Sequence, residues 1–220
     1  MPASARAFVL RHTALGPVPG LESIRLYLAD DVLAVWHAAQ IETGDLEVDL
    51  PYWAVAWGGG LAIARHLAVH PGLVSGRRVF DLASGSGLCA IAAVRAGAAR
   101  AVAADIDPFA LAAIEINARA NGCRVEVVGR DVLDGGAPEA DVVLAGDCWY
   151  EARLAGRVLP WLRRAVARGL DVLVGDPGRR YLPADELVEL ATYDVRTTSD
   201  LEDMDRRTGH VYRLRTVRRD

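Results

Sequence analysis

The chain has 220 residues, of which 52% are hydrophobic and 25% are charged, with a formal net charge of −4. This composition excludes an intrinsically disordered chain, a collagen-like repeat and a small disulfide scaffold. The mild acidity argues against a broad basic face for nucleic acid. All 25 basic side chains are arginine, so the chain carries no lysine amine of its own.

The cysteines and the hydropathy of the sequence indicate the compartment of the protein and whether it crosses a membrane. Cys89, Cys123 and Cys148 are widely spaced and form no CxxC pair, which favours a reducing compartment, and we expect a cytoplasmic protein. No apolar run reaches the roughly 18 residues of a membrane span, and no residue cluster has metal-ligand spacing. We expect a monomer with no metal, no membrane contact and no nucleic-acid partner.

Residues 1–50 are predicted to be an accessory segment that precedes the main domain, residues 51–220. The elements expected in this segment are a strand over 23–29 and a helix over 32–39 that Asp30 caps. Pro51 and the glycines at 58–60 then punctuate the chain before the next helical pattern begins.

From residue 61 on, helical and strand-like patterns alternate. The predicted strands are 79–82, 101–104, 125–128, 142–145 and 171–174, and the predicted helices are 61–69, 88–96, 108–121, 151–167 and 185–190. Pro160 is expected to kink or split its helix. Two last runs, 193–198 and 211–217, alternate with period two and flank a predicted loop, so they are expected to pair antiparallel. The pattern predicts an α/β fold: a Rossmann-like, doubly wound, mostly parallel seven-stranded sheet with an antiparallel C-terminal pair and an N-terminal extension.

Such a sheet binds ligands at the carboxyl ends of its strands. The first strand runs into Asp81 and a loop with Gly85 and Gly87, where the missing Cβ atoms allow a sharp turn and close approach to a ligand. Asp105 ends the second strand and can accept the hydroxyl protons of a ribose. Asp131 follows the third strand, at the level of an adenine amino group.

Two cofactors compete for this loop. The spacing Gly85-x-Gly87-x-x-Ala90 satisfies the dinucleotide pattern of NAD sites, and Asp105 suits their ribose acid. Asp81 favours S-adenosylmethionine instead, because a carboxylate there would repel a pyrophosphate but attract the ammonium of an amino-acid tail. The remaining interpretation is that the glycines are turn residues and the acids cap helices.

The chain resembles the seven-strand (class I) S-adenosylmethionine-dependent methyltransferases, in particular the electron-transfer flavoprotein β-subunit lysine methyltransferase branch. Five segments carry the resemblance: 51–60 (PYWAVAWGGG), 81–87 (DLASGSG), 104–108 (ADIDP), 146–150 (GDCWY) and 175–179 (GDPGR). The usual first glycine of the loop is Ala83 here, which narrows the space for the cofactor tail. The resemblance implies that Trp57 lies near the adenosine, that Ala145 lines the adenine side, that Asp147 contacts the substrate and that Arg179 lies beside the substrate channel. It also implies that residues 1–50 contribute to substrate choice.

Chemistry is expected after the fourth strand of the main domain. Asp147 and Tyr150 are three residues apart, so one turn brings a carboxylate and a phenol to the same mouth. We assign Asp147 first to binding and orienting an acceptor amine, with proton acceptance as the alternative. Trp149 or Tyr150 could pack against the methylenes or the charge of that amine.

Together with these patterns, the resemblance implies a methyltransferase that moves a methyl group from S-adenosylmethionine to a protein lysine, with the electron-transfer flavoprotein β-subunit as the suggested substrate. The alternative is a small-molecule, nicotinamide-like N-methyltransferase, for which residues 1–50 should close over the mouth of the site. An NAD-dependent oxidoreductase and a non-catalytic nucleotide-binding module are the further alternatives.

Overall fold

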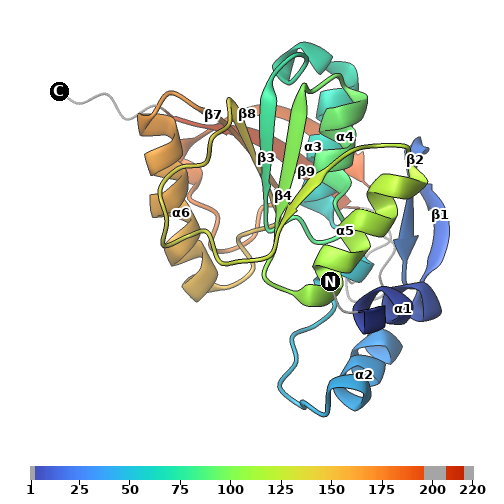
Figure 1. The fold of residues 1–220 in the computed structure, drawn as a ribbon. Coiled ribbons are helices and arrows are strands. Elements are labelled where there is room, and N and C mark those ends of the chain that lie inside the picture. Colours follow the sequence, from blue (N-terminus) through green and yellow to red (C-terminus); the bar gives the residue numbers. More distant parts are fainter. Residues whose placement is uncertain (1–2, 196–206, 216–220) are drawn as a thin grey trace.

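The computed structural model describes residues 3–195 and 207–215, which form a central sheet with helices on both faces (Figure 1). The strands of this sheet are β3 (Arg78–Leu82), β4 (Arg100–Ala104), β5 (Glu126–Val128), β6 (Val142–Gly146), β7 (Asp171–Asp176), β8 (Leu187–Val195) and β9 (Arg207–Leu214). Their order is β5-β4-β3-β6-β7-β9-β8, and β9 pairs antiparallel with β7 and β8 while the others run parallel. The predicted Rossmann-like sheet and its antiparallel edge pair are confirmed.

Alternation along the strands divides the core into two layers. Val79 packs toward the helices α3 (Gly58–Val69) and α4 (Leu88–Arg95), whereas Phe80 packs toward α6 (Ala152–Ala167) on the opposite face. Helix α5 (Pro108–Ala120) lies beside α4, and α6 stands alone on its side in Figure 1. The described residues also contain three short 3₁₀ turns: η1 (Tyr52–Ala54), η2 (Pro71–Leu73) and η3 (Ala184–Glu186).

The N-terminal segment packs against α5 rather than extending the large sheet. It consists of α1 (Ala3–His12), the antiparallel strands β1 (Ala14–Val18) and β2 (Leu21–Leu28), and α2 (Val32–Thr43). Asn117 of α5 ties this segment to the rest, because its Oδ1 accepts from Tyr27 N at 2.7 Å and its Nδ2 donates to Ser86 O at 2.8 Å. One buried side chain thus joins β2 to the loop that follows β3.

Several local predictions were wrong. Residues 187–190 belong to β8 and not to a helix over 185–190, because pairing with β9 and burial of Leu187 against the sheet outweigh local helical spacing. Helix α6 runs on through Pro160 without splitting, and β9 starts at Arg207, inside the predicted loop. Residues 196–198 and 216–217 of the two predicted last strands lie outside the described residues.

Two elements, α1 and β1, have no counterpart among the predictions. Helix α1 is held by Phe8 and Val9, which are fully buried against α5 and η1. None of the helices in the described part of the chain combines the length and apolar content that a bilayer crossing requires.

Candidate active site

A cavity of about 540 Å³ opens at the carboxyl ends of β3, β4 and β6. This volume lies within the range of small-molecule and cofactor pockets. Nine of the residues predicted for the site line it: Trp57, Asp81, Ala83, Gly85, Asp105, Asp131, Asp147, Tyr150 and Arg179. The structure therefore brings together residues at the carboxyl ends of five strands, β3 to β7, and at the start of α3.

Three predicted residues lie elsewhere, which corrects the predictions for them. Gly87 is buried at the start of α4 with φ +84°, and a Cβ atom there would lie 3.3 Å from Ile114 Cα, so this glycine serves the packing of α4 on α5. Ala145 is fully buried in β6 within the core on the α6 side, and it is not among the residues that line the cavity. Trp149 is only 1% exposed in the same core, so it packs under the site rather than at the substrate.

The loop after β3 presents its backbone to the cavity. Ala83 and Gly85 both have positive φ, +50° and +54°, in the left-handed region that L side chains seldom adopt. Gly85 N donates to Asp105 Oδ2 at 2.8 Å, and Asp105 Oδ1 accepts from Ile106 N at 2.8 Å. Asp105 thus holds the ends of β3 and β4 together, and its carboxylate lines the cavity at the position predicted for a ribose acid.

Asp81 is the buried charge of this site. It is 1% exposed and accepts hydrogen bonds from Ser84 Oγ at 2.5 Å and Ala90 N at 3.1 Å, both at Oδ2. Burial raises the pKa of Asp81 to about 7, and these two bonds only partly offset the rise. A buried carboxylate that lines a cavity and keeps Oδ1 for a further donor fits the ammonium of an amino-acid tail. The residues present therefore fit S-adenosylmethionine.

Asp107 and Asp131 have structural partners as well. Asp107 Oδ1 accepts from Phe109 N at 2.7 Å and caps α5, and burial raises the pKa of Asp107 to about 6. Asp131 forms an ion pair with Arg157 of α6 at 2.8 Å, which lowers the pKa of Asp131. Arg157, also a lining residue, was missed because no sequence signal connects α6 with the end of β5.

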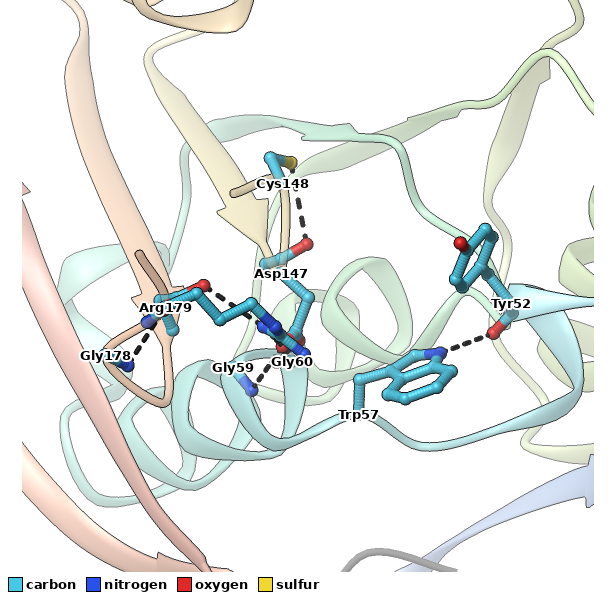
Figure 2. A network of polar contacts seen from close by, with 10 residues as sticks. Tyr52, Trp57, Gly59, Gly60, Asp147, Cys148, Gly178 and Arg179 are labelled. Atoms are coloured by element: carbon cyan, nitrogen blue, oxygen red, sulfur yellow. Dashed lines mark hydrogen bonds and ion pairs between the residues drawn. The ribbon is translucent and has the colours of Figure 1, made fainter. Parts of the chain in front are cut away.

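Asp147 lies at the centre of a polar network between β6, β7 and α3 (Figure 2). Its Oδ1 accepts from Gly59 N at 3.0 Å and its Oδ2 accepts from Gly60 N at 2.7 Å, at the start of α3. Arg179 completes the network with an ion pair to Asp147 at 2.5 Å and a second to Asp176 at 3.1 Å. The carboxylate of Asp147 is fixed by three donors at the wall of the cavity.

Local backbone geometry explains why the sequence needs these residues. Asp147 has φ +60°, a conformation that Asp tolerates better than most residues, and its N donates to Gly175 O at 2.8 Å. Gly59 approaches the same carbonyl so closely that a Cβ atom would lie 2.2 Å from Gly175 O. The glycine run at 58–60 therefore allows α3 to begin directly over the end of β7.

Aromatic rings and thiols complete the cavity wall. Trp57 Nε1 donates to Tyr52 O at 2.7 Å, and the rings of Tyr52 and Tyr150 lie with centroids 4.9 Å apart. Cys89 and Cys148 also line the cavity, and burial raises the pKa of both thiols. They remain protonated and are weak nucleophiles near neutral pH.

Comparison with known proteins gives one consistent result. Residues 68–146 match the family model described as ribosomal protein L11 methyltransferase. An electron transfer flavoprotein beta subunit lysine methyltransferase from Xenopus laevis is 36% identical over 178 residues, 79% of this chain and 70% of the relative. The protein of the same name from Homo sapiens is 40% identical over 131 residues, which cover 59% of this chain and 50% of that protein.

Solved structures give the same fold at lower identity. A ribosomal protein L11 methylase from Lactobacillus delbrueckii subsp. bulgaricus has a TM-score of 0.50 at 20% identity, over 70% of this chain and 77% of that one. Trm5b from Pyrococcus abyssi has a TM-score of 0.52 at 17% identity, over 87% of this chain and 53% of that one. These likenesses establish the fold alone.

Proposed function

Because the chain belongs to the electron transfer flavoprotein beta subunit lysine methyltransferase family of class I methyltransferases, we propose that it methylates a lysine amine of a protein. The observation that carries the proposal is a single cavity whose two ends are lined by different functional side chains. Asp81 and Asp105 lie at the glycine loop, and Asp147 and Tyr150 lie at the mouth. The beta subunit of an electron transfer flavoprotein is the acceptor we propose, from the names of the relatives.

The residues at the glycine loop are those that would hold S-adenosylmethionine. Asp81 would bind the ammonium of its amino-acid tail, Asp105 its ribose hydroxyls, and Trp57 and Asp131 would flank the adenosine. When bound, S-adenosylmethionine supplies an electrophilic methyl group on a sulfonium centre. Ala83 and Gly85 keep their backbone close to the cavity, which shapes the space for the tail.

At the other end, the residues orient an acceptor amine. Asp147 would accept a hydrogen bond from the amine, because its carboxylate is held in place by Gly59, Gly60 and Arg179. Arg179 neutralises part of the charge of Asp147, so the site does not hold a lysine permanently as an ammonium ion. Positioning two partners in line supplies roughly 7–11 kcal/mol toward a displacement reaction.

Residues 1–50 would form the substrate side of the enzyme, ahead of a methyltransferase domain over residues 51–220. Asp49 and Leu50 of this segment line the cavity, yet Tyr150 at the mouth is still 41% exposed. A mouth that stays open suits a polypeptide better than a small nicotinamide-like acceptor, which the alternative reaction would enclose. A buried carboxylate at Asp81 also disfavours the pyrophosphate of NAD.

The cellular compartment and the oligomeric state are part of the same proposal. All three cysteines are free, which supports a cytoplasmic enzyme. We place it there as a monomer that binds neither nucleic acid nor membrane.

Two measurements test the function. Calorimetry should detect S-adenosylhomocysteine binding and no NAD binding, and ligand at 100 times its dissociation constant should stabilise the protein by about 2.7 kcal/mol. S-adenosylmethionine with a labelled methyl group, added with the enzyme to a cell lysate, should label a protein band. The chain has no lysine, so lysine self-methylation cannot produce that band. Label only in small molecules, or stabilisation by NAD instead, would refute the proposal.

A further inference from the structure

The mouth of the cavity contains an aromatic pair, of which the proposed function assigns no role to Tyr52. Tyr52 of η1 and Tyr150 after β6 both line the cavity, with ring centroids 4.9 Å apart and ring planes tilted by 33°. Tyr150 is 41% exposed, so this pair lies where the cavity meets solvent.

Tyr52 is held on a rigid base. Its carbonyl oxygen accepts from Trp57 Nε1 at 2.7 Å, and the rings of Tyr52 and Trp57 have centroids 5.8 Å apart (Figure 2). The neighbouring Trp53 is 1% exposed and packs against Phe109, while Ala54 O accepts from Ala29 N at 2.9 Å. The Tyr52 ring is therefore placed before any acceptor arrives.

Acidic side chains flank this pair. Asp49 lines the cavity, Glu151 directly follows Tyr150 in the chain, and both side chains are exposed. After burial, their charges raise the pKa of Tyr52. Arg179, which also lines the cavity, lowers the pKa of the Tyr52 phenol. The surrounding sequence is acidic as well: from residue 26 to residue 64 the chain has no arginine, whereas it has six acidic side chains over 30–49.

We infer that Tyr52, Tyr150, Asp49 and Glu151 form the entrance for the acceptor and select a cationic amine carried on an aliphatic chain. Acidic groups beside a cavity raise the local concentration of an incoming ammonium. Aromatic faces pack against the methylenes of a lysine side chain and attract its charge. This inference rests on the proposed function, and it identifies Asp49, Glu151 and Tyr52 as specificity-determining residues for a lysine acceptor.

The charged part is tested with the double variant Asp49→Asn/Glu151→Gln, with the beta subunit of an electron transfer flavoprotein as the probe. Its KM should rise about three- to tenfold, since each lost charge weakens attraction modestly. The fall of kcat/KM between low and high salt should also become shallower. The matched control is Glu139→Gln/Asp185→Asn, which removes the same charge from exposed positions before β6 and β8, away from the mouth. It should match the wild-type KM and salt dependence.

The aromatic part is tested by Tyr52→Phe against Tyr52→Leu. The phenylalanine variant keeps the ring and should keep KM within about twofold, while the leucine variant should raise KM about fivefold or more. The dissociation constant of S-adenosylhomocysteine, measured on the same proteins, distinguishes an acceptor effect from a damaged cofactor site. It should change less than KM in every variant.

The outcomes separate this inference from the function on which it rests. A wild-type enzyme that methylates no protein would refute the proposed function. A wild-type enzyme that methylates the beta subunit, with both double variants equal in KM and salt dependence, would overturn the inference alone. Equal KM for Tyr52→Leu and Tyr52→Phe, with cofactor affinity retained, would overturn the aromatic part.

Discussion

Affinity for S-adenosylhomocysteine should depend on pH through Asp81. This carboxyl is 1% exposed, and burial raises its pKa to about 7 in the free protein. An ammonium bound at Asp81 favours the ionised carboxylate and lowers that pKa. Below pH 7 the ligand must therefore displace a proton, and its apparent affinity falls.

The magnitude follows from the size of the pKa shift. With a free-state pKa near 7, most of the protein at pH 8 has Asp81 ionised, whereas at pH 6 about one molecule in ten does. The dissociation constant should therefore rise about tenfold from pH 8 to pH 6, which is about 1.4 kcal/mol. The dissociation constant should stop rising once the pH falls below the pKa that Asp81 has in the complex.

Isothermal titration calorimetry from pH 5 to pH 8.5 measures this dependence and the proton released on binding. Asp105 and Asp107 also have raised pKa values, so two controls isolate Asp81. The variant Asp81→Asn should bind weakly and lose the step near pH 7. 5′-Methylthioadenosine, which lacks the amino-acid tail, should bind the wild type without that step. A constant affinity of S-adenosylhomocysteine across this range would refute the pairing of Asp81 with the ammonium.

Three further predictions concern stability and the network at Asp147. Asp81 has a higher pKa in the folded state than in the unfolded chain, so its ionisation destabilises the fold increasingly as pH rises from about 4 to about 7. Asp81→Asn should therefore raise the Tm of the ligand-free protein at pH 8 by several degrees. An unchanged or lower Tm would contradict the raised pKa of Asp81. Gly59→Ala would place a Cβ atom 2.2 Å from a backbone carbonyl, so it should lower the free energy of unfolding in denaturant by several kcal/mol. The control Gly156→Ala, at an exposed position of α6, should raise that free energy by about 0.5–1 kcal/mol. Equal stability of the two variants would contradict the close approach of α3 to β7. Asp147→Asn preserves the left-handed backbone but breaks the ion pair with Arg179. The rate of methylation should fall at least about a hundredfold, while the affinity for S-adenosylhomocysteine changes less than about threefold. Equal losses of rate and affinity would show that Asp147 serves the fold instead.

The sequence predicts which residues near the ends of β3 and β4 line the cavity, because those signals are local. Asp81 lies near the end of β3, Gly85 is in the loop that follows β3, and Asp105 directly follows β4. The ends of parallel strands meet at one edge of a sheet. The same reasoning brings Asp147 to the cavity.

What the sequence could not show depends on long-range contacts. Asp147 meets Gly59 and Gly60 across 88 and 87 residues, and no pattern near either end predicts that pairing. Trp149 was misplaced because a tryptophan beside two site residues looks the same whether it faces the cavity or the core. In the structure its ring fills the core on the α6 side. Only the first part of β8 was misread: residues 187–190 were predicted as helix, but they continue the strand that pairs with β9.

The most direct test of the central claim is mass spectrometry of a purified electron transfer flavoprotein beta subunit after incubation with the enzyme and S-adenosylmethionine. The account predicts an added methyl group that maps to a lysine, and its absence when Asp147→Asn replaces the wild type. A beta subunit of unchanged mass beside a methylated small molecule, or methylation at a residue other than lysine, would contradict it.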